Sequence, residues 1–170
     1  MGLNFSVIKH INLSDEQVEK IVSLKEEHWK YGIPSQKEWL IRNICNDDYH
    51  ILGYFDGKLI AYSNVVSVDG VTDNGKVCFM GLGNVCIDKC FQKRGFGKEL
   101  IRFINGFLEK ANRIGLLLCK EKTVAFYGKN GWKELPDHTV FVNGTVFADK
   151  AMFYSKKQVL FSKVFLNRTF

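Results

Sequence analysis

A glutamine and two glycines lie where an expected strand gives way to an expected helix. Gln92, Gly95 and Gly97 follow the apolar segment VCI and precede the helical pattern ELIRFI. The first amides of a helix have no partner within the helix and lie at the positive end of its dipole. Glycines let a ligand approach these amides without interference from a Cβ atom. A turn of this composition favours the binding of a phosphate group.

Two nucleotide-binding motifs are poor interpretations of this turn. A Rossmann fingerprint requires three glycines, G-x-G-x-x-G, with an acidic residue about 20 positions further on, and the third glycine is missing after Gly97. A Walker loop requires G-K-[ST], and Lys98 is followed by Glu99. A tight turn that binds no ligand stays open as an alternative.

Local sequence patterns predict the strands and helices that position this turn. Ser14 and Gln17 have the spacing of a capping box at a helix start, and Asp56-Gly57 and Asn143-Gly144 are typical of hairpin turns. Because hairpins and crossover connections both occur, we expect a mixed sheet. The expected segments are strands at residues 4–11, 49–55, 58–68, 77–87 and 114–120, helices from Ser14 to the stop at Gly32 and at about 35–46, 95–112 and 123–130, a turn or loop at 70–76, and a hairpin and final strand within 138–155.

Length and composition predict a single domain. The 170 residues are 46% apolar, which is enough for one hydrophobic core over residues 1–170. No run approaches the ~20 apolar residues that cross a bilayer, and the N-terminus has no apolar stretch of signal-peptide length. We therefore expect a cytoplasmic protein with no membrane partner.

A net charge of +6 favours anionic partners such as nucleic acids, phosphorylated cofactors or acidic surfaces. The basic residues are spread along the chain, with one local cluster at Lys89, Lys93, Arg94 and Lys98. No basic run and no helix-turn-helix or zinc-finger spacing is visible. Nucleic-acid binding is therefore the weaker alternative, and salt-dependent binding of DNA or RNA without a nucleotide cofactor would identify it.

The five cysteines include no C-x-x-C pair. An odd number with mostly apolar neighbours indicates reduced, buried thiols in a cytosolic protein rather than a disulfide framework or a zinc site. We expect no metal site and no catalytic cysteine, because a nucleophilic thiolate needs a histidine or a helix N-terminus beside it.

Two segments together carry a family resemblance. VCIDKCFQKRGFGKELI, followed about 30 residues later by AFYGKNGW, resembles the GCN5-related N-acetyltransferase (GNAT) superfamily, and the order of expected elements agrees over residues 5 to 155. The resemblance implies an α+β fold, a three-layer α/β arrangement in which a mixed, mostly antiparallel twisted sheet is flanked by helices. It also implies an acyltransferase domain over residues 1–170, with residues 156–170 as a C-terminal extension.

The resemblance assigns roles to individual residues. Acetyl-CoA is the implied co-substrate, and the backbone of Ile87 is expected to bind its pantetheine arm, with Val85 two residues upstream on the same strand edge. Tyr127 is the implied general acid that protonates the departing thiolate. The residues implied to bind the pyrophosphate are Gln92, Lys93, Arg94, Gly95, Phe96, Gly97 and Lys98.

Several positions depart from the family pattern. The positions at which relatives carry a glutamate base correspond to Gly81 and Gly83, and the usual Asn and Ala before the short helix are Lys120 and Thr123, of which Thr123 is expected to cap that helix. A water relay through backbone carbonyls or a residue elsewhere must then accept the amine proton. The candidate bases are Asn84, Asp88 and the pair Glu26-Glu27.

The acceptor site is implied to lie near the first helices and the late hairpin. Trp29, Tyr31 and Trp39 lie in the first of these segments, where they suit a cationic or aromatic amine or, alternatively, the core. We expect a primary amine of a small molecule as acceptor, attacking directly in a ternary complex. An aminoglycoside, a polyamine and a peptide stay open as acceptors, as do a non-catalytic CoA-binding module and a homodimer.

Overall fold

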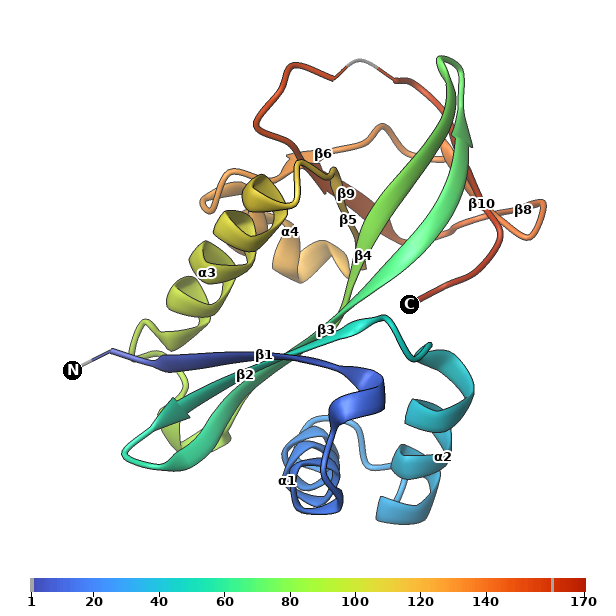
Figure 1. Ribbon diagram of the computed structural model, residues 1–170. Helices are drawn as coiled ribbons and strands as arrows, with labels where there is room; N and C mark the ends of the chain where they lie inside the picture. The colour runs from blue at the N-terminus through green and yellow to red at the C-terminus, as the bar shows by residue number, and fades with distance from the viewer. Residues whose placement is uncertain (1, 160) are drawn as a thin grey trace. The chain divides into compact units, whose positions relative to one another are not determined.

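The computed structural model describes residues 2–159 and 161–170; Met1 and Leu160, which belong to the domain expected over residues 1–170, lie outside the described residues. The chain divides into two compact units. Unit 1 comprises Met1–Val66 and Gly83–Phe103, and unit 2 comprises Ser67–Leu82 and Ile104–Phe170. Three elements pass from one unit into the other, as the ribbon in Figure 1 shows: β3 (Lys58–Thr72), β4 (Gly75–Ile87) and α3 (Phe96–Lys110).

Unit 1 contains an antiparallel sheet formed by the first strands of the chain. Strand β1 (Asn4–Lys9) pairs with β2 (Tyr49–Phe55), and β2 pairs with the first half of β3 (Figure 1). The β2–β3 turn places Asp56 and Gly57 at φ values of 47° and 77°. Positive φ at both central residues matches a type I′ hairpin, which confirms the Asp-Gly prediction.

Two helices of unit 1 begin at well-defined caps. Helix α1 (Asp15–Glu26) follows the 3-10 helix η1 (His10–Asn12) and begins at Ser14, whose side chain accepts from the amide of Gln17 in the predicted capping box. Helix α2 (Ile33–Asn43) begins earlier than the range predicted for it, because a proline fits its first turn, and it also ends earlier, at Asn43.

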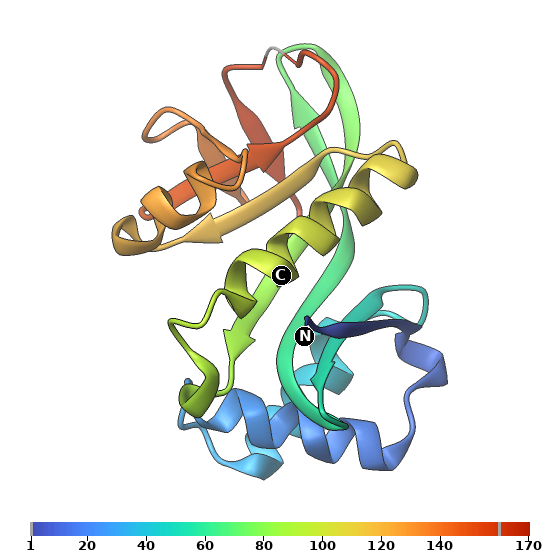
Figure 2. The same cartoon turned by 90° about the vertical axis from the view of Figure 1, so that its left-hand side faces the viewer.

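The strand order within unit 2 is β6-β9-β5-β4-β3-β10-β7-β8. The pairs β4–β5 and β7–β10 are parallel and the other described pairs are antiparallel, which confirms the mixed, mostly antiparallel sheet with helices. Figure 2 shows the same ribbon from the side. The remaining elements are β5 (Gly115–Cys119), α4 (Glu121–Gly128), β6 (Lys133–Glu134), β7 (Val140–Val142), β8 (Thr145–Val146), β9 (Lys150–Tyr154) and β10 (Val164–Leu166), with the 3-10 helix η2 (Lys89–Phe91) in unit 1.

Two features of unit 2 differ from the sequence prediction. Strand β3 continues to Thr72, through the segment expected as a loop, so that only Asp73 and Asn74 form the turn. The C-terminal extension contains strand β10, which pairs with Gly70 to Thr72 and with β7. Both features depend on pairing between segments far apart in the sequence, which local patterns do not report. In the described part of the chain no helix is long and apolar enough to cross a membrane.

Candidate active site

The turn between β4 and α3 has the backbone geometry of an anion-binding loop. Lys93 and Gly95 have positive φ values of 61° and 90°. Residues with positive φ that alternate with residues of negative φ direct successive backbone amides to the same side of the chain. The amide of Glu99 makes the first bond of the helix, to Gly95 O at 3.1 Å. The amides of Phe96 to Lys98 therefore have no partner within the helix. A Cβ atom built on Gly95 would meet nothing within 4 Å, so the space in front of the turn is open.

An aromatic cluster supports this turn from beneath. The ring of Phe96 is buried and lies 5.2 Å from the ring of Phe55 and 6.1 Å from that of Phe91. The Arg94 guanidinium lies over Phe91, 5.1 Å from the ring centroid. The prediction that Arg94 adds positive charge for a phosphate remains a prediction, and the cation–π contact holds this exposed guanidinium beside the turn. Phe96 then contributes only its amide to the predicted phosphate site.

Strand β4 ends in a network that was not predicted. The carbonyl of Ile87 accepts a hydrogen bond from Gln92 Nε2 at 3.2 Å, and His28 Nε2 lies 2.9 Å from the same oxygen. Val85 and Ile87 are half-buried. The pantetheine contact predicted for the backbone of Ile87 stays a prediction, and with two neighbours at its carbonyl the amide is the backbone group left for it. No local sequence pattern indicates that His28 lies at this carbonyl, since the two residues are 59 positions apart.

The three candidate carboxylate bases hold backbone or cationic groups. Asp88 is buried, which alone would raise the pKa of its carboxyl, but hydrogen bonds from Lys58 and the amide of Cys90 lower it overall. Glu26 accepts from the amide of Gly32 at the start of α2, at 3.0 Å. Glu27 accepts from the amide of Lys89, also at 3.0 Å. Each carboxylate therefore has a structural partner that competes with a role as a base.

The middle of β4 has no carboxylate and an irregular backbone. In unit 2, a Cβ atom on Gly81 would lie 2.5 Å from Cγ of Phe170, so the Phe170 ring fills the space that a side chain would need. In unit 1, Ser63 Oγ donates to the carbonyl of Gly83 at 2.9 Å. Asn84 has a φ of 51° and donates from Nδ2 to Asn64 Oδ1 at 2.6 Å. The two glycines predicted to replace the base are thus packed or bonded by other groups.

Tyr127 lies in α4 of unit 2 and is 8% exposed. Burial raises the pKa of its phenol, so the hydroxyl keeps its proton at neutral pH. Its ring contacts Phe126 and Trp132, and Trp132 Nε1 donates to Asn105 Oδ1 at 3.0 Å. Helix α4 begins at Lys120 without a side-chain cap.

The cap predicted for Thr123 is wrong, because this residue lies inside the first turn of α4. There its hydroxyl donates to the carbonyl of Lys120 at 2.8 Å instead of accepting from an amide.

Comparison with known sequences identifies the family. A profile of the acetyltransferase (GNAT) domain matches residues 46–134, slightly more than half of the 170-residue chain. The chain belongs to the GNAT acetyltransferase family. The matched range includes the turn at residues 92–98 and Tyr127, on which the resemblance was based. No curated protein sequence matches the chain.

Solved GNAT structures share the fold at low sequence identity. YhbS of Escherichia coli, a GNAT family N-acetyltransferase in complex with CoA, is 12% identical over 98% of this chain and 91% of its own, with a TM-score of 0.69. An aminoglycoside 6'-N-acetyltransferase complexed with coenzyme A is 13% identical over 91% of this chain and 99% of its own, with a TM-score of 0.68. The ribosomal-protein-S18-alanine N-acetyltransferase of Escherichia coli is 13% identical over 92% and 97%, with a TM-score of 0.64. At these identities the structures show the fold.

As a GNAT protein, the chain is an acyl-CoA-dependent acetyltransferase. The open turn at Gly95 and the unpaired first amides of α3 fit the binding of an anionic cofactor group. Among the described residues no cluster of histidine, cysteine or carboxylate side chains has the geometry of a metal site.

The cysteines of this GNAT chain are less uniform than predicted. None of the five forms a disulfide, but Cys45 and Cys90 are exposed and Cys78 and Cys119 are half-buried, so that the prediction of buried thiols is fully met by Cys86 alone. Exposure at Cys45 and Cys90 arises because both lie in connecting segments, outside the strands.

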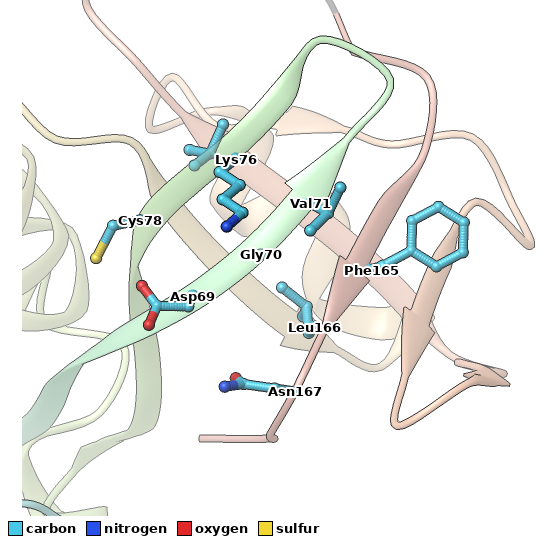
Figure 3. A pocket seen from close by; sticks show the side chains of 9 residues that line it. Asp69, Gly70, Val71, Lys76, Cys78, Phe165, Leu166 and Asn167 are labelled. Atoms are coloured by element: carbon cyan, nitrogen blue, oxygen red, sulfur yellow. The ribbon is translucent and has the colours of Figure 1, made fainter.

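A pocket of about 610 Å³ lies in unit 2, and its lining includes none of the predicted site residues. Figure 3 shows its side chains extending from β3, β4 and β10, among them Asp69, Lys76 and Cys78. Burial raises the pKa of the Cys78 thiol, and Arg113 NH2 donates to its sulfur at 2.8 Å. Because a protonated thiol is a poor nucleophile, this pocket has no group suited to acyl transfer.

Proposed function

We propose that this GNAT protein transfers an acetyl group from acetyl-CoA to a primary amine of a small molecule, in the cytoplasm, by direct attack within a ternary complex. The observation that carries the proposal is the open turn at Lys93 to Lys98, where positive φ at Lys93 and Gly95 precedes a helix with unpaired first amides. Such a turn suits a pyrophosphate. The CoA complexes of two GNAT proteins with this fold support the same assignment.

Proton transfer to the leaving group is assigned to Tyr127. Acetyl transfer from a thioester releases a thiolate, whose conjugate acid has a pKa close to the ~8.5 of cysteine. Burial keeps the phenol of Tyr127 protonated, so it has a proton to donate to such a group. Tyr127 would donate its hydroxyl proton to the sulfur as the carbon–sulfur bond breaks.

Direct attack is favoured over a cysteine-bound acyl intermediate. Burial raises the pKa of Cys86, Cys78 and Cys119, so none of these thiols is activated as a nucleophile. Two-substrate kinetics should therefore give intersecting rather than parallel lines in double-reciprocal plots.

The acceptor class rests on the segment between α1 and α2. Tyr31 is 70% exposed and Trp29 is half-buried, so both rings are available to an amine. Aromatic side chains suit the organic part and the charge of a small amine. We expect acetyl transfer, followed by release of free thiol, with at least one member of a panel of aminoglycosides, polyamines and amino acids. Reaction with long basic peptides alone would exclude a small-amine acceptor, and CoA binding without any reaction would favour a CoA-binding module.

A pair of substitutions at Gly95 tests the cofactor site. Any side chain at a φ of 90° is strained, but a Cβ atom there meets nothing within 4 Å. Gly95→Ala therefore serves as the control for backbone strain, and Gly95→Asp adds a negative charge in front of the amides. Calorimetry with acetyl-CoA should show moderately weakened binding for the alanine variant and at least tenfold weaker binding for the aspartate variant than for alanine. Equal affinities of the two variants would refute the phosphate assignment, and tighter binding of NADH than of acetyl-CoA would refute the choice of cofactor.

A further inference from the structure

We propose that His10, His50 and Tyr62 form a proton relay that carries the proton lost by the acceptor amine to solvent. The proposal rests on the proposed acetyl transfer and supplies its missing base. All residues of the relay belong to unit 1, which also contains the predicted cofactor residues Val85 to Lys98.

The relay is a continuous chain of hydrogen bonds. His10 Nδ1 lies 2.9 Å from His50 Nε2, and His50 Nδ1 lies 2.9 Å from the hydroxyl oxygen of Tyr62. His50 and Tyr62 are fully buried, whereas His10 is partly exposed. An imidazole and a hydroxyl each donate one hydrogen bond while accepting another. The three groups can therefore pass a proton from the interior to the surface.

A pair of asparagines connects the inner end of this chain with β4. Tyr62 and Asn64 are two residues apart on β3, so their side chains lie on the same face of the sheet. Asn84 donates to Asn64 Oδ1, and Asn64 itself is fully buried. Asn64 Nδ2 has no hydrogen-bond partner among the described residues.

A buried amide that no protein group reaches, such as Asn64 Nδ2, is ordinarily satisfied by ordered water. We infer a water between Asn64 Nδ2 and the Tyr62 hydroxyl, since a buried water needs at least two polar neighbours. Asn84, which donates to Asn64 Oδ1, is partly exposed and directly precedes Val85. In the relay, the amine approaches this water from the side of Asn84, next to the part of β4 where the thioester is expected.

The charges around the relay favour the release of a proton. The groups that face His50 are His10, Lys25 from α1 and Tyr62. The charge of Asp48 favours a higher pKa for His10, against the effect of burial. Burial, together with His10 and Lys25, lowers the pKa of His50 to about 3. Burial also lowers the pKa of His10. Neither imidazole retains an extra proton at neutral pH, which suits a relay better than a base that stores the proton.

The proton count of one turnover balances. As the carbon–nitrogen bond forms, the amine passes a proton to the water, which passes one to the oxygen of Tyr62. The hydroxyl proton of Tyr62 moves to His50 Nδ1, the proton on His50 Nε2 moves to His10 Nδ1, and His10 Nε2 releases a proton to solvent. Each group of the relay ends neutral, and Tyr127 protonates the thiolate separately and regains a proton from solvent once CoA has left, which offsets the proton released at His10. When the site is empty and both ends meet solvent, a proton passing in the opposite direction restores the first tautomers.

Removal of one hydroxyl tests the relay. Tyr62→Phe keeps the buried ring and breaks the chain, so kcat at pH 7 should fall by about 10²-fold while the affinity for acetyl-CoA is retained. The difference in kcat between Tyr62→Phe and the wild type should become smaller at higher pH, because hydroxide then takes the amine proton directly. Tyr54→Phe, the same change on β2 outside the chain, should keep the wild-type kcat and pH profile. A wild-type pH profile in Tyr62→Phe would overturn the relay alone, and a wild-type protein inactive toward every amine would overturn it together with the proposed function.

A second variant keeps the test decisive if Tyr62→Phe does not fold. His10→Ala removes the partly exposed end of the relay, so added imidazole should restore kcat, as a purely structural role would not allow. Absence of rescue overturns the proposal. In the unliganded wild-type protein, nitrogen-15 spectra of the histidines should show His50 neutral down to about pH 4, given its pKa of about 3. A His50 that titrates like a free histidine would show that the chain does not exist.

Discussion

Replacement of Lys25 by methionine should stabilise this protein at neutral pH. Lys25 lies on α1, is 2% exposed, and its ammonium lies over Trp39, 4.1 Å from the ring centroid. Burial lowers the pKa of this ammonium from 10.5 to about 8. At pH 7 the folded protein therefore keeps a charge that its interior disfavours. Methionine has a similar length and no charge, so it can fill the same space.

The pKa shift sets the expected magnitude. A change from 10.5 to about 8 corresponds to about 3 kcal/mol by which folding disfavours the charged lysine at pH 7. Loss of the contact with Trp39 offsets about 0.5–2 kcal/mol of this gain. We expect Lys25→Met to raise the free energy of unfolding by about 1–2 kcal/mol at pH 7. The folded pKa is depressed, so the penalty shrinks as pH rises from 8 toward 10.5, and at pH 10 less than about 1 kcal/mol should remain.

Urea unfolding at pH 7 and pH 10, followed by circular dichroism, measures both values. Lys20→Met, on the exposed face of the same helix, is the matched control and should change the stability little at either pH. A Lys25→Met protein less stable than wild type at pH 7 would refute the reasoning. A stability difference that is the same at both pH values would refute the assignment of the effect to charge.

Two further predictions concern the proposed acid and the buried histidine. Tyr127→Phe should lower kcat by about 10²-fold with little change in acetyl-CoA affinity, measured by thiol release and calorimetry, and full turnover would show that water protonates the thiolate. Because the pKa of His50 is lowered to about 3, stability should fall as pH drops below 6.5, by about 5 kcal/mol near pH 3. His50→Asn should lose this part of the acid sensitivity in urea unfolding, whereas the exposed control His138→Asn should keep it; equal acid sensitivity in both variants would contradict the burial argument.

The sequence predicted best those features that depend on neighbouring residues. The capping box of Ser14 and Gln17 and the turn at Asp56-Gly57 need only local geometry, and both are confirmed. The backbone geometry of the turn before α3 is also local, because Gly95 and the helix start lie within a few residues of each other, while phosphate binding there stays a prediction. Strand β10 could not be predicted, since its three residues acquire a strand conformation only through β3 and β7.

Side-chain partners were harder to predict than backbone structure. Arg94 was expected to add charge near a phosphate, and the sequence did not indicate that aromatic rings from two other segments would lie beside its guanidinium. Glu26 and Glu27 were expected as possible bases, yet they accept from backbone amides that lie 6 and 62 positions away. His10 and His50 meet across 40 positions. No periodicity reports such contacts, because they depend on how complete strands and helices pack.

The absence of a carboxylate from the middle of β4 limits how this GNAT protein can remove the amine proton. Gly81 and Gly83 carry no side chain that could act as a base; the ring of Phe170 fills the space beside Gly81, and the carbonyl of Gly83 already accepts a hydrogen bond from Ser63. The nearby carboxylates of Asp88 and Glu27 are bound to Lys58 and to a backbone amide. In unit 1, the face of the sheet that carries Tyr62 and Asn64 instead contains buried polar groups that lead to the partly exposed His10. A proton taken from an amine near Asn84 therefore has a route to solvent through neutral groups, without a stored negative charge in the core.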